Sequence, residues 1–254
     1  MCLILFSFAP ETDTPLVVLA NRDEFYARDT QQAGFWDDYP DILAGRDNVA
    51  GGTWMGVHRN GRFAAVTNYR DPSEIVPDAR SRGELTVNFL SGGFTSKEYL
   101  LAVQQAGDQY SGFNLIVYDS DGLGYYSNRS EQGPVSLSSG TYGLSNHLLD
   151  TPWSKVVAGK AALNKRLQES RPLDHSLLEI LADTEQAPDE ALPETGVGME
   201  LERILSARCI VSPEYGTRCS TLVKVSSTRS IHFIERTLVP EDLNPAVVLF
   251  DIKP

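Results

Sequence analysis

The amino-acid sequence predicts an α+β protein, arranged as a four-layer αββα sandwich of two stacked antiparallel sheets flanked by helices. Strand-like and helix-like patterns occur in blocks, in the order strands, helices, strands, helices, strands. Because each sheet must bury its apolar face, this order favours two sheets packed on each other with the helices outside. The 254 residues contain no repeat, linker or low-complexity segment, so residues 1–254 are predicted to form a single domain.

Two β-hairpins are predicted at the start of the chain. Short β-rich runs at Leu3–Phe8 and Pro15–Ala20 are separated by a polar turn and predict the first hairpin. The second is predicted at Thr53–Val57 and Phe63–Thr67, because the Asn-Gly pair between these runs suits a turn with positive φ. The first strand therefore begins beside Cys2.

Helical periodicity follows the hairpins. Apolar residues recur at helical spacing from Ser81 to Val103, and a pair of glycines divides this stretch into two helices. Further helices are predicted from Pro152 to about Leu167 and around Ser176–Leu181. Segment 186–198 is rich in proline and acidic residues, which predicts a mobile loop and makes it a candidate lid.

The remaining predicted strands lie in the middle and at the end of the chain, where β-branched and aromatic residues cluster. They are Phe113–Tyr118, Gly124–Ser127, Tyr142–Ser145, Cys209–Val211, Thr221–Val225, Ile231–Ile234 and Val247–Phe250.

The charge balance argues against two kinds of partner. The formal net charge is −12 with a pI of about 4.8, and the sequence contains no basic patch. Such a surface repels phosphate backbones and anionic lipid headgroups, so we expect no nucleic-acid partner. The apolar stretch Cys2–Ala9 is too short for a signal-peptide core or a membrane span. We therefore expect a cytoplasmic protein without a membrane span.

Cysteine and histidine usage gives no sign of a disulfide framework or a metal centre. The three cysteines, Cys2, Cys209 and Cys219, form no CxxC pair, and their odd number fits a reducing compartment. The four histidines are scattered, without an HExxH pattern. We expect neither a metal nor another cofactor. The sequence carries no prediction of oligomeric state.

Cys2 is the first candidate for chemistry. Removal of Met1 would leave a first residue that carries both a thiol and a free α-amine. An α-amine has a pKa near 8, so a useful fraction is neutral at physiological pH and can take the thiol proton. The alternative is that Cys2 is only a small apolar residue at the start of a strand.

The segment Asn21-Arg22-Asp23-Glu24 ends the second strand of the first hairpin, and so returns beside Cys2. A cation near the thiol lowers its pKa, and a carboxylate can orient the amine. The alternative is an ordinary charge cluster at a strand end.

Three further polar residues stand at predicted strand ends. Asn68 and Asn146 could donate hydrogen bonds to a developing oxyanion, although each could equally be a turn residue. Arg218 precedes a β-rich run, where it could hold a substrate carboxylate or the aspartate of the site. A surface ion pair is the alternative for Arg218.

Several short segments carry a resemblance to a known family. They are Met1–Ile4, Ala20–Phe25, Gly51–Gly56, Thr67–Tyr69, Ser81–Leu85, Gly112–Leu115, Tyr142–Asn146 and Tyr215–Arg218. Together they resemble the NRDE family, also called transport and Golgi organisation family 2, almost from end to end of the chain. The family name describes a motif or a phenotype and implies no particular reaction.

A more distant resemblance carries more chemistry. The chain is similar to the cysteine-type N-terminal-nucleophile (Ntn) hydrolases that include penicillin V acylase and choloylglycine hydrolase. That resemblance implies the αββα fold and a site of six residues in order: Cys2, Arg22, Asp23, Asn68, Asn146 and Arg218. Arg22 and Asp23 are adjacent here, whereas those hydrolases separate the corresponding residues. Either the strand ends or bulges at Arg22, or Asn21 or Glu24 takes the role of the aspartate.

The resemblance implies an N-terminal-cysteine amidohydrolase or thioesterase that acts on a small non-peptide acyl amide or thioester through an acyl-enzyme on Cys2. The alternative is a non-catalytic carrier of an apolar anionic ligand such as haem or acyl-CoA. A structural or interaction protein with a decayed site is the third reading, and the presence of all six polar residues disfavours it.

Overall fold

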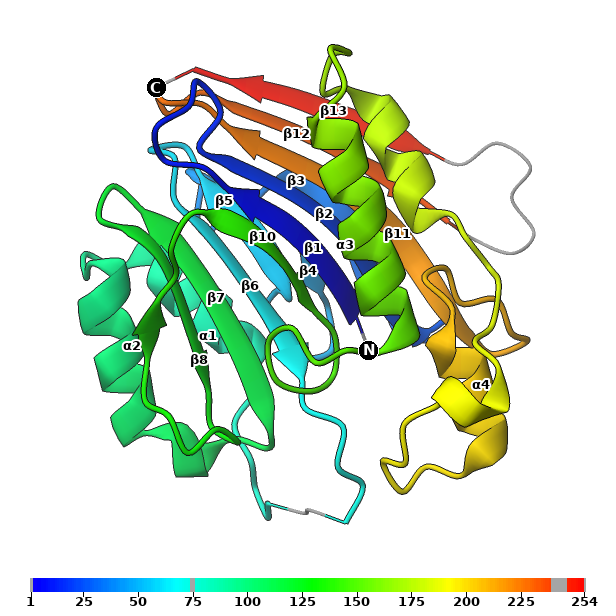
Figure 1. Ribbon diagram of the computed structural model, residues 1–254. Coiled ribbons are helices and arrows are strands. Elements are labelled where there is room, and N and C mark those ends of the chain that lie inside the picture. The colour runs from blue at the N-terminus through cyan, green and yellow to red at the C-terminus, as the bar shows by residue number, and fades with distance from the viewer. Residues whose placement is uncertain (1, 74–75, 239–245, 254) are drawn as a thin grey trace.

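A computed structural model describes residues 2–73, 76–238 and 246–253 (Figure 1). Two antiparallel sheets are stacked on each other. One has the strand order β10 (Gly140–Leu144), β1 (Cys2–Phe8), β2 (Leu16–Phe25), β11 (Tyr215–Val225), β12 (Ile231–Thr237), β13 (Val247–Ile252). The other has the order β3 (Thr30–Phe35), β4 (Ile42–Asp47), β5 (Met55–His58), β6 (Phe63–Asn68), β7 (Phe113–Asp119), β8 (Gly122–Ser127), β9 (Val135–Ser136).

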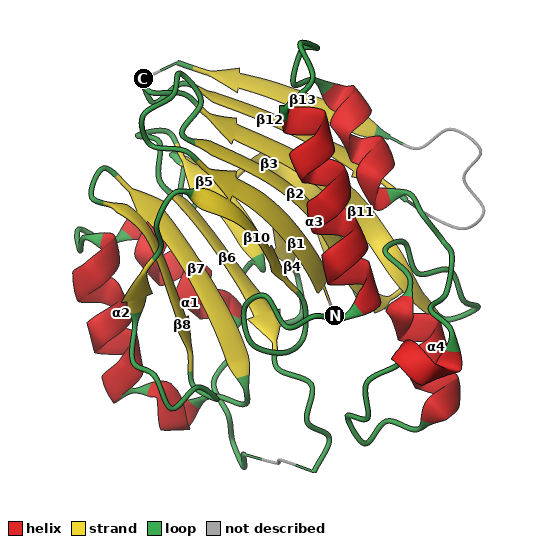
Figure 2. Cartoon of the chain, viewed as in Figure 1, coloured by secondary structure: helices red, strands yellow, loops and turns green. Residues whose placement is uncertain are grey.

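Helices cover the outer face of each sheet, which completes the predicted αββα sandwich (Figure 2). α3 (Ser154–Leu167) and the 3₁₀ helix η2 (His175–Leu181) pack on the six-stranded sheet, whereas α1 (Gly83–Ser91) and α2 (Ser96–Gln105) pack on the seven-stranded sheet. α4 (Met199–Ser206) and the short turns η1 (Gly107–Gln109) and η3 (Asp189–Ala191) complete the helices described.

Alternation along β1 and β2 assigns each residue to one face of the six-stranded sheet. Even-numbered residues such as Ile4 and Val18 pack into the core between the sheets. Odd-numbered residues such as Leu3 and Val17 pack against α3 and η2. This follows from the two-residue period of a strand, and it decides which way the polar residues at the end of the hairpin point.

Both predicted hairpins are present, as β1–β2 and β5–β6, and Gly61 in the second turn has a φ of +94°. The predicted strand Cys209–Val211 is wrong, because this segment contributes only an isolated bridge between Val211 and Gly216. β11 instead begins at Tyr215, six residues before the predicted Thr221.

Apart from the two-residue strand β9 and the short turns η1 and η3, three elements were not predicted from the sequence. β3 is a polar strand at the edge of its sheet, with two exposed glutamines, so it lacks the apolar alternation that marks a strand. β4 was passed over between the two predicted hairpins. α4 has only eight residues and begins directly after the predicted loop 186–198, and two of the three residues that follow Met199 are acidic, so its helical pattern is weak.

Candidate active site

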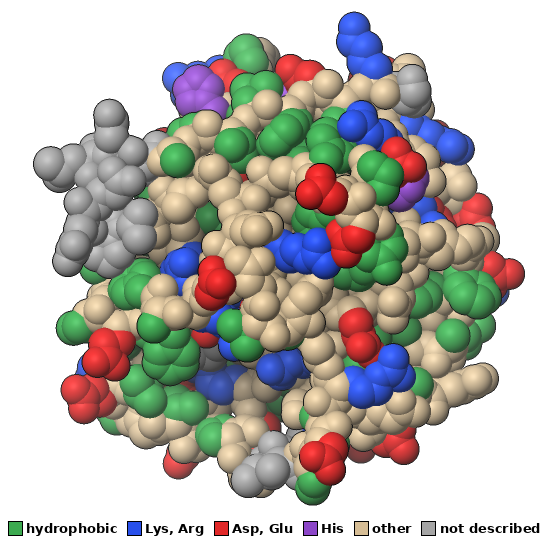
Figure 3. Space-filling view, turned by 180° about the vertical axis from the view of Figure 1, so that it is seen from behind, with side chains coloured by type: hydrophobic (Ala, Val, Ile, Leu, Met, Phe, Trp, Pro, Cys, Tyr) green, Lys and Arg blue, Asp and Glu red, His purple; other side chains and the backbone are tan. Residues whose placement is uncertain are grey.

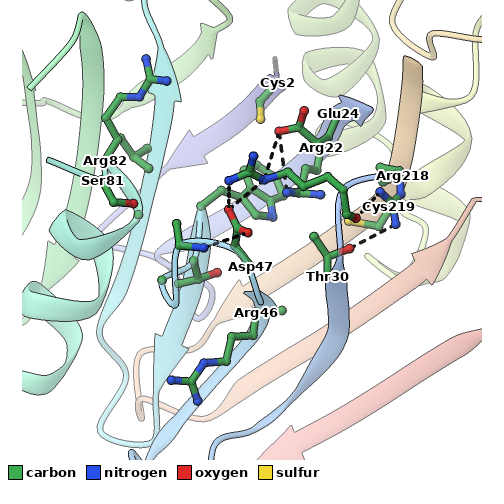
Figure 4. A pocket seen from close by; sticks show the side chains of 18 of the residues that line it. Cys2, Arg22, Glu24, Thr30, Arg46, Asp47, Ser81, Arg82, Arg218 and Cys219 are labelled. Atoms are coloured by element: carbon green, nitrogen blue, oxygen red, sulfur yellow. Dashed lines mark hydrogen bonds and ion pairs between the residues drawn. The ribbon is translucent and has the colours of Figure 1, made fainter. Parts of the chain in front are cut away.

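A cavity of about 480 Å³ lies between the two sheets, at the end where β1 begins. Its walls come from both sheets and from the segment before α1 (Figure 4). The wall formed by the loop after β4 and the start of α1 is closely packed, because a Cβ added to Gly52 would lie 2.6 Å from the carbonyl carbon of Gly83. The cavity therefore has a defined wall where the loop after β4 meets the start of α1.

Cys2 is the first residue of β1 and is 7% exposed, with its thiol directed at the cavity (Figure 4). The Ser145 hydroxyl donates a 3.0 Å hydrogen bond to the Cys2 carbonyl and so joins the ends of β1 and β10. Burial raises the pKa of the Cys2 thiol, and the Asp23 carboxylate adds to the rise, whereas Arg22 opposes it. The thiol is therefore protonated at neutral pH and needs a base.

Arg22 and Asp23 point to opposite faces of the six-stranded sheet. β2 continues through both residues to Phe25, so the strand does not end at Arg22. The irregularity lies in the neighbouring strand β11, whose register shifts between Thr217 and Cys219. Arg22 is paired with Cys2 across the hairpin and shares its face, whereas the Asp23 side chain lies on the α3 side.

Asp23 is 1% exposed and sits in a polar pocket beneath the first residue of β1. The Thr217 hydroxyl donates a 2.7 Å hydrogen bond to its carboxylate, and the Tyr215 hydroxyl donates to its backbone carbonyl at 3.0 Å. Burial raises the pKa of Asp23, whereas the charge of Lys155 on α3 opposes this shift. Asp23 is thus a buried carboxyl held on the side of the sheet away from the thiol.

The two other candidates for the aspartate role lie in different places. Asn21 is fully buried, and its amide donates to the carbonyls of Leu181 and Arg208 and accepts from Ser220, so it ties strand to loop. Glu24 faces the cavity with Arg22, from which it is separated by 3.9 Å. Neither lies in the pocket that Asp23 occupies.

The two asparagines have different positions. Asn68, at the end of β6, lines the cavity. Asn146 is fully buried and is not among the described residues of the cavity wall; its amide donates a 3.0 Å hydrogen bond to the Asn68 carbonyl. The Ser145 hydroxyl lies 3.2 Å from the Asn146 side-chain oxygen. Asn146 therefore links Asn68, through Ser145, to the first residue of β1, and does not itself face the cavity.

Arg218 is the extra residue of the β11 irregularity and lines the cavity. Its guanidinium donates to the carbonyls of Phe25 and Arg28, at 2.8 and 3.0 Å, and to the Thr30 hydroxyl. The hydrogen bonds of Arg218 go to Phe25, Arg28 and Thr30, whereas the Asp23 carboxylate accepts one from Thr217 on the other face of the sheet. Arg218 secures the connection between β2 and β3.

The charged residues that lie near the site but were not predicted from the sequence include two on helices and two in the cavity wall. Lys155 is buried beside Asp23, and Arg82 and Glu235 line the cavity. Glu202 is buried in a 2.6 Å ion pair with Arg70, behind the end of β6. Lys155 and Glu202 lie on amphipathic helices, where one charged residue on the buried face carries no sequence signal. Arg82 stands in the family-like segment Ser81–Leu85, which could have found it.

The stability of the protein should depend on pH through Lys155. Burial lowers the pKa of the Lys155 ammonium from 10.5 to about 8, although the Asp23 charge opposes the shift. Between these values the unfolded chain binds a proton that the folded chain does not, so this group makes stability rise with pH. We expect the free energy of unfolding of the protein with Lys155 minus that of Lys155→Met to increase from pH 8 to pH 10.

Urea unfolding of both proteins across this pH range measures the difference. Both proteins carry Cys2→Ala, because the Cys2 charge acts on Lys155 and its titration would not cancel, whereas the titrations of the tyrosines are common to both. A difference that is constant with pH would contradict a depressed lysine pKa in the folded protein.

The candidate lid lies elsewhere. No residue of segment 186–198 is found in the cavity wall that the structure describes. The segment packs instead against α4, where the Thr195 backbone N–H donates to Glu202 at 3.0 Å and Asp189 binds Arg203. Its acidic and threonine side chains therefore join α4, and in this structure the segment does not border the cavity.

The described part of the chain contains no group of three or more His, Cys, Asp or Glu side chains placed to hold a metal ion. Among the described helices, none is both long and apolar enough to cross a membrane.

The two stacked antiparallel sheets, flanked by helices, form an Ntn-hydrolase-like sandwich fold. The solved structure of a Caenorhabditis elegans N-acylethanolamine-hydrolyzing acid amidase ortholog is similar to this chain. It matches with a TM-score of 0.50 over 87% of this chain and 92% of its own, at 11% identity. This likeness supports the fold.

The chain belongs to the transport and Golgi organisation 2 family, whose model matches residues 1–240. It is 40% identical to the human transport and Golgi organization protein 2 homolog, over 96% of this chain and 95% of the human protein. It is 27% identical to the Drosophila melanogaster protein of the same name, over 95% and 94% of the two chains.

Proposed function

We propose that this protein is an N-terminal-cysteine hydrolase of a small non-peptide amide or thioester, which acts through an acyl-enzyme on Cys2. The observation that carries the proposal is the placement of Cys2, whose thiol opens on a cavity on one face of the sheet while Asp23 lies buried on the other. Removal of Met1 would create an α-amine at this edge, between the thiol and the carboxyl.

This arrangement gives the adjacent residues Arg22 and Asp23 separate tasks. Arg22 shares the thiol's face and favours its ionised form. Asp23, held by Thr217 and facing Lys155, would orient the α-amine from the other face. Arg22 and Asp23 are adjacent and therefore point to opposite faces of the strand. This arrangement suits Cys2, because its thiol and its α-amine would leave the strand in different directions.

The chemical steps follow from these positions. The neutral α-amine takes the Cys2 proton, and the thiolate attacks the carbonyl carbon of the substrate. The Asn68 amide would donate to the oxyanion, with Asn146 holding the Asn68 backbone in place. The protonated amine then gives its proton to the leaving nitrogen or sulfur. Water, deprotonated by the same amine, attacks the Cys2 thioester and releases the acid.

The composition of the cavity wall bears on the carrier alternative. The wall is mainly polar and charged, and its larger apolar side chains are Trp54 and Val66. A carrier of an apolar ligand is expected to have a mostly apolar pocket. The wall therefore favours a polar or charged substrate, and we retain the enzyme as the better-supported function.

Peptide mass spectrometry tests the proposal directly. We expect the purified protein to lack Met1 and to take one acyl group from a panel of activated thioesters, on Cys2 in preference to Cys209 and Cys219. The reason is that only Cys2 would carry the free α-amine as a base, whereas desolvation raises the pKa values of the Cys209 and Cys219 thiols as well. Retention of Met1, or equal labelling of the three cysteines, would contradict the mechanism.

A further inference from the structure

The wall of the cavity is rich in arginine, although the chain as a whole has a net charge of −12. Six arginines line it against four acidic residues, one of which, Asp23, has its side chain on the far face of the sheet. In the view from behind, basic side chains lie recessed within the surface (Figure 3). A concentration of cations in a hollow of an acidic protein attracts anions to that hollow.

Most of these arginines are already committed to partners. Three of them make ion pairs of 2.6–2.7 Å, which are Arg28 with Asp47, Arg46 with Asp38 and Arg80 with Glu84. Arg218 donates to two backbone carbonyls and a hydroxyl, as described above. These four guanidinium groups hold the walls together and have few donors left for a ligand.

Arg22 and Arg82 differ from the other four. Arg22 has Glu24 at 3.9 Å, a carboxylate that is equally far from Arg28, and donates no hydrogen bond to the described residues. Arg82 donates one hydrogen bond, to the Gly112 carbonyl at 3.1 Å, and has no ion pair within the part of the chain that is described. A guanidinium has five N–H donors, so both retain most of their binding capacity.

Both arginines line the same cavity as Cys2, from different walls, and each interacts with it electrostatically. Arg22 is the direct partner of Cys2 across the β1–β2 hairpin. Arg82 precedes α1 on the opposite wall, and the Cys2 thiolate would favour its charged form. Burial disfavours the charge of Arg82, which leaves an energetic deficit that a bound anion would offset.

We propose that Arg22 and Arg82 form an anion-binding subsite beside Cys2, which holds a carboxylate or phosphate group of the substrate. The inference rests on the proposed function, because it names the substrate class of that site as acyl donors with an anionic group close to the scissile bond. A guanidinium binds either anion through two parallel hydrogen bonds. The cavity volume of about 480 Å³ limits the bound part to a small molecule.

Alkylation of Cys2 by a matched pair of reagents tests the subsite without any substrate. Iodoacetate and iodoacetamide share one reactive group and differ in charge. Peptide mass spectrometry follows the rate constant of each reagent at Cys2. We expect the rate constant for iodoacetate divided by that for iodoacetamide to be about tenfold or more higher in the folded protein than in urea. Arg82→Gln and Arg22→Gln should each return the ratio toward the urea value.

Arg46→Gln is the matched control, because it removes the same charge from the same cavity but from an arginine bound by Asp38. An equal drop of the rate ratio in Arg46→Gln would contradict the subsite, and would indicate that iodoacetate is attracted by the summed charge of the cavity. Any loss of thiol ionisation slows both reagents alike and leaves the ratio unchanged. Protection of Cys2 by added propionate or by inorganic phosphate, whichever acts at the lower concentration, names the anion.

The two proposals fail in different ways. A high iodoacetate ratio without acylation by thioesters would retain the subsite and contradict the hydrolase. Acylation of Cys2 with equal ratios in the folded and unfolded protein would retain the hydrolase and contradict the subsite. Resistance of Cys2 to both alkylating reagents would contradict both proposals, since each requires an accessible thiol.

Discussion

Replacement of Cys2 by Ala is expected to abolish acylation and to lower turnover of any accepted thioester by about a thousandfold or more, as for removal of a catalytic nucleophile. Alanine keeps the small side chain that permits removal of Met1 and fits the start of β1, so the fold should persist. Circular dichroism and urea unfolding check the fold, and steady-state kinetics measure the loss. Retention of full turnover would end the proposal.

An insertion separates the thiol from the amine. One alanine inserted between Met1 and Cys2 leaves the thiol on the chain but moves the free α-amine to the preceding residue. We expect a loss of about a hundredfold or more, because general-base catalysis contributes on that order. Cys209→Ala is the control, since Cys209 lies outside the cavity wall, and it should leave turnover unchanged.

Replacement of Glu202 by Ala is expected to cost about 3–5 kcal/mol in the free energy of unfolding, because it leaves the Arg70 charge buried without its carboxylate. Both side chains are about 5% exposed, and the ion pair measures 2.6 Å. The other Glu202 oxygen accepts from the Thr195 backbone N–H and hydroxyl. Urea unfolding followed by circular dichroism measures the loss.

The same helix provides a matched control. Arg203 on α4 forms an ion pair of similar length, 2.7 Å, with Asp189, but both side chains are about half exposed. Arg203→Ala should therefore cost less than about 1 kcal/mol. Equal costs for Glu202→Ala and Arg203→Ala would contradict the distinction between buried and exposed pairs. The double variant Arg70→Met with Glu202→Leu should recover part of the loss, because it removes both charges together.

Much of the fold could be predicted from residue patterns. The β1–β2 hairpin and helices α1 and α3 follow from apolar spacing and from polar turns that interrupt it. The prediction failed where local pattern was weak. β3 is stabilised by pairing with β4 at a sheet edge, and the first residues of β11 pair with β2 across a bulge that leaves no local trace.

The site residues also divide into those that the sequence predicts and those that only the structure places. The sequence marks Cys2, Arg22 and Asp23 because they stand in short segments with a recognisable order. It cannot assign their faces, since a strand that continues and one that ends after Asn21 look alike in the residues themselves. Lys155 and Glu202 are hidden among helical residues, and only the packing of α3 and α4 brings them to the hairpin.

The sequence by itself determined the order of elements, the sandwich class, the family resemblance and the position of Cys2 at the head of the first strand. These depend on local periodicity and on short motifs, which are readable along the chain. Only the tertiary structure decided that Asp23 faces α3, that Asn146 supports Asn68, and that segment 186–198 packs against α4. Those outcomes depend on contacts between residues far apart in the sequence, which the hydrophobic packing of two sheets creates.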